Sequence, residues 1–207
     1  MPVYKLVYFP ARARAEVSRL LFAAAGQDYE DEIVTFEQWE HIRGSTPYGQ
    51  LPVLVVDNIQ VNQAGAICRY LAREFGMYGD NTIDHTMVDV VTETCNDVWT
   101  EMVKIYYNKD EAIKEEVRQN LKNTVLPKFK GFIEKMLKAN EDSYLVGSKI
   151  SLADIVVFDI LDKSSDGGIF TVATEDDLKD YELVKALVDR VKAAPGIKEY
   201  LGSRPPQ

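Results

Sequence analysis

Residues 51–76 read LPVLVVDNIQVNQAGAICRYLAREFG, and this stretch decides the first half of the fold. Two short apolar runs, 53–56 and 59–61, flank the pair Asp57-Asn58, a composition typical of a tight β-hairpin. From about residue 64 to residue 75 the apolar residues recur with helical spacing, and Gly76 ends the pattern. The stretch therefore predicts two antiparallel strands followed by a helix.

The residues before this stretch predict a strand, a helix and a second strand. Residues 3–9, VYKLVYF, alternate between two faces as a strand does. Helical spacing follows over 14–26 and ends on a glycine suited to a C-terminal cap. A second strand is predicted for 29–34, before Gly, Pro, Ser and Thr around 43–50 interrupt regular structure. The order βαβ followed by ββα is that of a thioredoxin-like fold.

The second half of the chain has helical patterns and almost no strand signal. Apolar residues at three- and four-residue steps over 88–102 predict one long helix, and 112–138 predict more helix around Pro127. The sequence SLAD at 151–154 is an Asp variant of the capping box and predicts a helix start.

These patterns predict an α/β plus all-α chain with two domains. Residues 1–79 form a thioredoxin-like βαβ-ββα domain, and residues 80–207 form an all-helical domain. The tail, 204–207, is expected to be dispensable.

Composition excludes several classes of protein. With 46% hydrophobic and 28% charged residues the chain is expected to be globular, and 24 Lys plus Arg against 33 Asp plus Glu make nucleic acid an improbable partner. No stretch approaches the roughly 18 apolar residues of a membrane span, and the first residues do not resemble a signal peptide, so a cytoplasmic protein without membrane contact is expected.

The cysteines and histidines point to neither redox nor metal chemistry. Cys68 and Cys95 lie far apart and outside any CxxC pair, so no disulfide framework or thiol redox motif is expected. His41 and His85 cannot by themselves indicate a metal cage. We therefore expect no metal.

Four segments resemble the cytosolic glutathione transferases, most closely their sigma class, which is related to S-crystallins and glutathione-dependent prostaglandin D synthase. They are YKLVYFPARARAE (4–16), IRGSTPYGQLPVL (42–54, after Trp39), NQAGAICRYLAREFG (62–76) and VGSKISLADI (146–155). The resemblance implies a homodimeric enzyme that conjugates glutathione, its substrate, to small apolar electrophiles. Two alternatives stay open: a catalytically weak, S-crystallin-like structural protein, and a prostaglandin isomerase.

Tyr8 is the first chemical candidate. A tyrosine in a strand is usually a core residue, but its phenol can also donate a hydrogen bond to an anion. The resemblance implies that Tyr8 stabilises the glutathione thiolate. Arg14, at the start of the following helix, would add positive potential through its charge and the helix dipole.

The resemblance also implies a cradle for the rest of glutathione. Trp39 and Arg43 would hold the glycyl carboxylate, and the Leu51 backbone, before a cis-proline, would pair with the cysteinyl unit. The full set implied to bind glutathione is Tyr8, Arg14, Trp39, Arg43, Gln50, Leu51, Pro52, Gln63, Ala64 and Asp97.

Position 64 departs from the family pattern, which is Gln-Ser, since the chain has Gln63-Ala64. The backbone N–H at this helix start can still bind the γ-glutamyl carboxylate, but one hydroxyl donor is missing. Its loss is worth about ten- to hundredfold in affinity. Asp97 resembles the acidic residue that reaches across the dimer to the γ-glutamyl amine, although a solvated helix carboxylate is the alternative.

The pocket for the electrophile is the least legible part of the sequence. By analogy with the family it would be lined by residues of both halves, although an apolar stripe at helical spacing is more often plain core. These residues are Phe9, Pro10, Trp99, Met102, Tyr106, Ile155 and Asp159.

Overall fold

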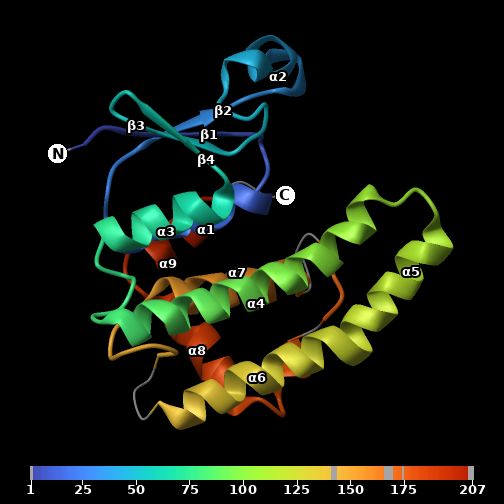
Figure 1. Cartoon of the computed structure of the whole chain (residues 1–207). Coiled ribbons are helices and arrows are strands. Elements are labelled where there is room, and N and C mark those ends of the chain that lie inside the picture. Colours follow the sequence, from blue (N-terminus) through green and yellow to red (C-terminus); the bar gives the residue numbers. More distant parts are fainter. Residues whose placement is uncertain (1, 141–143, 166–169, 174, 205–207) are drawn as a thin grey trace. The chain divides into compact units, whose positions relative to one another are not determined.

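A computed structural model of the chain describes residues 2–140, 144–165, 170–173 and 175–204 (Figure 1). The contacts divide the chain into two compact units. One, here called the sheet unit, contains the residues up to Gly76 and those from Ala194 onward; the other, the helical unit, is 77–193. This division differs from the predicted boundaries of 1–79 and 80–207, because the C-terminal segment belongs to the sheet unit.

The sheet unit has the predicted thioredoxin-like order. Its four strands are arranged β2-β1-β3-β4, with β1 parallel to β2 and antiparallel to β3, and β3 antiparallel to β4. The strands are β1 (Tyr4–Tyr8), β2 (Glu30–Ile33), β3 (Val53–Val56) and β4 (Ile59–Asn62). The helices are η1 (Ala13–Ala15), α1 (Glu16–Ala25), α2 (Phe36–Ile42), η2 (Arg43–Ser45), α3 (Ala64–Glu74) and α9 (Ile197–Ser203).

The predicted apolar stripes of α1 and α3 form the core of this unit. Leu20 and Leu21 of α1 and Ile67 and Leu71 of α3 have no exposed surface, and the two helices pack together. Burying each such side chain contributes about 1.5–3 kcal/mol. Gly26, at φ +60°, ends α1 in the left-handed conformation that the sequence predicted.

Helix α2 was not predicted from the sequence. It begins after Thr35, whose hydroxyl accepts from the Gln38 N–H at 3.2 Å, while the Gln38 side chain accepts from the Thr35 N–H at 2.8 Å. This is a capping box, and its pattern at 35–38 was the signal that could have revealed the helix.

The expectation of a dispensable tail is wrong for Arg204. Its guanidinium donates to the Glu16 carboxylate at 3.0 Å, and the Tyr200 hydroxyl donates to the same carboxylate at 2.9 Å. Glu16 is only 1% exposed, so these donors compensate a buried charge. The other residues of the predicted tail, 205–207, lie outside the described residues.

The helical unit confirms the all-helical prediction for the second half. Helices α4 and α7 lie side by side (Figure 1), and α7 is buried along nearly its whole length. No helix in the described ranges is both long and apolar enough to cross a membrane. The elements are α4 (Thr82–Tyr107), α5 (Glu111–Asn120), η3 (Leu121–Val125), α6 (Leu126–Ala139), α7 (Leu152–Ser164), η4 (Glu175–Leu178) and α8 (Glu182–Ala193).

The predicted capping box starts α7. The Asp154 carboxylate accepts from the N–H and the hydroxyl of Ser151, both at 2.8 Å, and from the N–H of Leu145 at 2.8 Å. Asp154 has no exposed surface, and burial raises its pKa to about 6, with the three hydrogen bonds opposing that effect. The cap therefore also fastens the segment before the helix.

Candidate active site

Three predicted site residues meet at one end of the sheet. Tyr8 is the last residue of β1, Pro52 precedes the first residue of β3, and Gln63 follows the last residue of β4. Because β3 is antiparallel to both β1 and β4, the register brings these three positions into one row, next to the last pairs that β3 forms, Val7 with Val53 and Val53 with Asn62. A site at this end can thus use groups from three strands.

The Tyr8 side chain is held in place by its surroundings. It is 6% exposed and clusters with Leu6 and Ala15, with the half-buried Leu51 packed against them. The backbone N–H of Arg14 donates to the Tyr8 hydroxyl oxygen at 3.3 Å. A phenol carries one O–H donor, and this contact uses the oxygen rather than that proton. Arg14 thus contributes its main chain to the site, which the sequence did not predict.

Two strained backbone positions flank this end of the sheet. Ala13, the first residue of η1, has φ +28°, and Gln63, directly before α3, has φ +72°. Residues other than glycine rarely adopt positive φ, and such strain concentrates at functional sites. Gln63 forms no side-chain cap for α3, whose first residue is Ala64.

Two aromatic residues, Phe9 and Trp39, pack together beside the sheet. Trp39 on α2 is 9% exposed and clusters with Val7, Val34 and Val53 of the sheet region. The Phe9 ring meets the Trp39 ring edge-on, with centroids 5.9 Å apart. Trp39 is therefore largely a core residue.

The remaining predicted residues of the sheet unit lie on the loop between α2 and β3. Arg43, directly after α2, and Gln50 are exposed, whereas Leu51 is half-buried. The Leu51-Pro52 peptide is cis, as the resemblance implied.

Comparisons with protein families agree with this arrangement. The N-terminal domain of glutathione S-transferases matches residues 2–73, and the C-terminal domain of the same family matches residues 96–204. The chain belongs to the glutathione S-transferase family.

Several relatives of this transferase match it over nearly the whole of the given chain. Probable glutathione S-transferase 6 of Caenorhabditis elegans is 38% identical over 98% of the chain and 97% of its own length. S-crystallin SL11 of Nototodarus sloanii is 36% identical over 99% of the chain and 98% of its own. The solved structure of prostaglandin synthase D of Nilaparvata lugens is 35% identical, covers 99% of each chain and has a TM-score of 0.86. The relatives therefore support an enzyme, a glutathione S-transferase.

The predicted residues of the transferase's helical unit have varied environments. Asp97 is exposed on α4, and Tyr106 on the same helix is 69% exposed. Met102 and Ile155 have no exposed surface, which places them in the core of the unit rather than on an open wall. Phe9 and Pro10 belong to the sheet unit.

Asp159 and Trp99 belong to a buried charged cluster on α4 and α7. Asp159 accepts from Lys163, one helical turn later, and the Lys163 ammonium lies 4.9 Å from the centre of the Trp99 ring. The i, i+4 pair of opposite charges in an apolar helix was the sequence signal for Lys163. Burial, aided by the Asp159 charge, raises the pKa of the Cys95 thiol well above its ordinary value, which disfavours a nucleophilic role.

The described ranges hold no group of three or more His, Cys, Asp or Glu side chains that could bind a metal ion.

Proposed function

We propose that this transferase activates glutathione by donating the Tyr8 O–H to its thiolate. The observation that carries the proposal is the position of Tyr8, which is buried at the end of β1 with its oxygen bound by the Arg14 N–H at 3.3 Å. That contact fixes the ring and makes the phenol a stronger donor, because an oxygen that accepts a hydrogen bond gives up its proton more readily. The proton is then presented to an anion with little reorganisation.

The energetic demand on the site is moderate. A free thiol with a pKa near 8.5 is only about 3% ionised at neutral pH. Lowering its pKa by about two units requires roughly 2.7 kcal/mol of preferential stabilisation of the anion. One charge-assisted hydrogen bond supplies about 1.5–3 kcal/mol, so Tyr8 provides most of it and positive potential near Arg14 the remainder.

The rest of glutathione would occupy the row of positions at the end of the sheet. The backbone at Leu51, before the cis-proline, would pair with the cysteinyl unit, and the amides at the start of α3 would bind the γ-glutamyl carboxylate. Trp39 and Arg43 would hold the glycyl carboxylate, with Gln50 beside them. Arg43 suits this role because it is exposed and follows α2 directly.

The finer class and assembly are part of the same proposal. We place the chain in the sigma class, as a cytoplasmic homodimer in which Asp97 of one subunit reaches the γ-glutamyl amine bound by the other. The exposure of Asp97 on α4 suits a residue that binds a ligand held by the other subunit. Phe9, Pro10, Trp99, Tyr106 and Asp159 would shape the electrophile pocket, with Met102 and Ile155 as buried support.

A structural role is the second candidate, and the 36% identity to an S-crystallin favours it. The missing hydroxyl at Ala64 is the feature of the site that fits a protein released from catalysis. The prostaglandin synthase relative supports a third variant of the enzyme, with the same thiolate chemistry and a different second substrate.

The deciding experiment is conjugation of a chloronitroarene by the purified protein while glutathione is titrated. We expect saturable conjugation well above the uncatalysed rate. A rate equal to that of the buffer, from a folded protein that still binds glutathione, would favour the structural role.

A further inference from the structure

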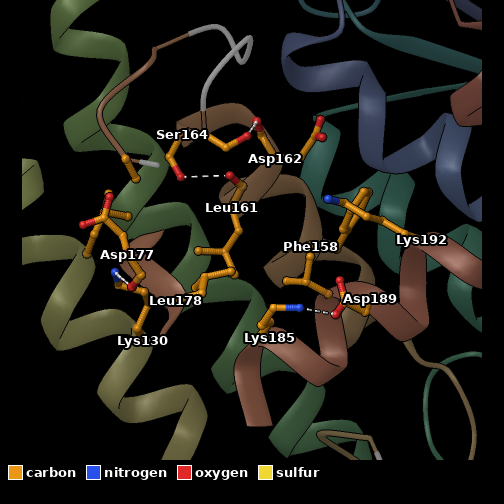
Figure 2. Close-up of a pocket in the computed structure, with 14 residues that line it drawn as sticks. Lys130, Phe158, Leu161, Asp162, Ser164, Asp177, Leu178, Lys185, Asp189 and Lys192 are labelled. Atoms are coloured by element: carbon orange, nitrogen blue, oxygen red, sulfur yellow. Dashed lines mark hydrogen bonds and ion pairs between the residues drawn. The ribbon is translucent and has the colours of Figure 1, made fainter. Parts of the chain in front are cut away.

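A cavity lies within the helical unit, among residues other than those predicted for the active site. It has a volume of about 180 Å³ and lies among α6, α7, η4 and α8 (Figure 2). Its apolar wall includes Leu126, Phe158, Leu161, Leu178 and Val188. None of the residues predicted to bind glutathione or the electrophile lines it.

Lys130 of α6 is a buried cation on one side of this cavity. The residue is only 5% exposed, and its ammonium donates to the backbone carbonyl of Asp177 at 2.8 Å and lies 5.0 Å from the centre of the Tyr181 ring. Within the part of the chain that the structure describes, it forms no ion pair with a carboxylate. A lysine has three donors, so a buried ammonium with these partners can still bind an anion.

Burial is the dominant influence on Lys130. It lowers the pKa of the ammonium, although the charges of Asp177 and Asp180 act in the opposite direction. Buried charges normally have a partner of opposite charge, because an uncompensated one is costly. A ligand anion would supply that partner.

Lys130 is the cation best placed to bind a ligand anion, because the other charged groups that line the cavity are ion-paired or exposed to water. Across from it, Lys185 of α8 is bound to Asp189 at 2.7 Å, and Lys192 is exposed (Figure 2). Asp162 and Asp177 are half-exposed and can remain hydrated.

The serine hydroxyls of the cavity are already committed as donors. Ser164 donates to the carbonyl of Leu161 at 3.0 Å, and Ser165 donates to the carbonyl of Asp162 at 2.9 Å. An anion here would therefore be bound by the Lys130 ammonium and not by the serine hydroxyls.

We propose that this cavity binds a small carboxylate with a short apolar body, its carboxylate on Lys130 and its hydrocarbon against the leucine and phenylalanine wall. The volume suits a ligand on the order of ten heavy atoms, since a water-sized position takes about 10–15 Å³. A purely polar anion would leave the apolar wall unused, and a neutral lipid would leave the ammonium uncompensated.

Octanoate is a suitable probe, and its binding is measured by calorimetry with S-hexylglutathione present to occupy the active site. We expect saturable binding, with 1-octanol and inorganic phosphate binding at least about tenfold more weakly. Lys130→Met should weaken octanoate about tenfold or more, as expected for loss of a charge-assisted hydrogen bond. Lys128→Met, an exposed lysine on the same helix, is the matched control and should bind as the wild type does.

Methyl NMR of the wild type locates the ligand even if Lys130→Met does not fold. Octanoate should shift the methyl signals of Leu126, Leu161 and Val188 and leave those of Leu6 and Leu54, in the sheet, unchanged. No binding, equal binding by a folded Lys130→Met, displacement by S-hexylglutathione, or methyl shifts confined to other residues would each overturn the proposal.

Discussion

The backbone N–H of Arg14 donates a hydrogen bond to the hydroxyl oxygen of Tyr8 over 3.3 Å. Because the donor is the main chain, the position of the phenol does not depend on which side chain stands at residue 14. The charge of Arg14 and the placement of Tyr8 can therefore be tested separately.

Tyr8→Phe should leave the fold intact and lower turnover by about ten- to a thousandfold, because it removes one donor to the thiolate and almost no volume. The ultraviolet absorbance of the bound thiolate should move to higher pH. Arg14→Ala keeps the backbone donor, so its effect measures the side chain alone. A Tyr8→Phe enzyme with full activity and an unchanged thiol titration would show that the phenol is not the activator.

Local patterns predicted most of the fold, and contacts between distant residues account for what was missed. The hairpin, α1, α3 and the α7 cap all follow from neighbouring residues, whose turn, capping and periodic signals act within a few positions. The bond between Glu16 and Arg204 joins residues 188 positions apart, so no local signal could reveal it.

For the candidate site too, the sequence predicted local features and missed those that depend on packing between distant residues. The sequence named Tyr8 and the loop at 50–52, and the register of the sheet brings them together. It could not show that Trp39 is largely buried or that Met102 and Ile155 lie in the core, because burial depends on how the helices pack.

The partners of Glu16 give a stability prediction for the C-terminal segment. Arg204→Gln removes the nearer of two cationic partners of a carboxylate that is 1% exposed, so the free energy of unfolding should fall by about 2 kcal/mol. Urea unfolding measures the change. Lys198→Gln, at an exposed position on α9, should alter it by less than about 0.5 kcal/mol. Equal stability of both variants would show that the Tyr200 hydroxyl and the Arg19 guanidinium, which lies 3.8 Å from the Glu16 carboxylate, suffice to compensate Glu16.

Asp154 predicts a dependence of stability on pH. Its pKa is about 6 in the folded protein against an ordinary value of 3.8, so between these values the folded state binds more protons than the unfolded state. Its contribution to stability is therefore fully present below about pH 4 and is lost as the pH rises through about 6. Asp154→Asn cannot titrate and serves as the reference.

Urea unfolding of both proteins tests this dependence. The stability of the wild type relative to Asp154→Asn should be greater by about 2 kcal/mol at about pH 4.5 than at about pH 7.5. Taking the difference between the two proteins removes the titration of the other groups. A difference that grows with pH instead would mean that the hydrogen bonds from Ser151 and Leu145 outweigh burial.

Asp97 tests the proposed dimer. Sedimentation should show about twice the mass of the chain, and Asp97→Ala should raise the Michaelis constant for glutathione more than it lowers turnover, as expected when binding is lost equally from ground and transition states. Asn96→Ala, at the neighbouring exposed position, is the control. A fully active monomer would contradict both the assembly and the role of Asp97.

Ala64 is where this chain departs from its family pattern, and the structure sharpens the expected effect of restoring serine. The residue before it, Gln63, has φ +72° and forms no side-chain cap, so the N-cap side chain does not accept from the first amides of α3. Ala64→Ser adds one donor at a helix start already suited to an anion. The glutathione dissociation constant should fall severalfold, a gain of about 1 kcal/mol, while turnover hardly changes.

Calorimetry without an electrophile measures the effect of Ala64→Ser, with Ala25→Ser, at the exposed end of α1, as the control for a serine placed on a helix of the same unit. A protein released from catalysis would have lost turnover as well, and one hydroxyl would not restore it. If the wild type already binds glutathione tightly and Ala64→Ser leaves that affinity unchanged, the backbone amides and Gln63 suffice to hold the γ-glutamyl carboxylate. The missing hydroxyl would then no longer favour a structural role over an enzyme.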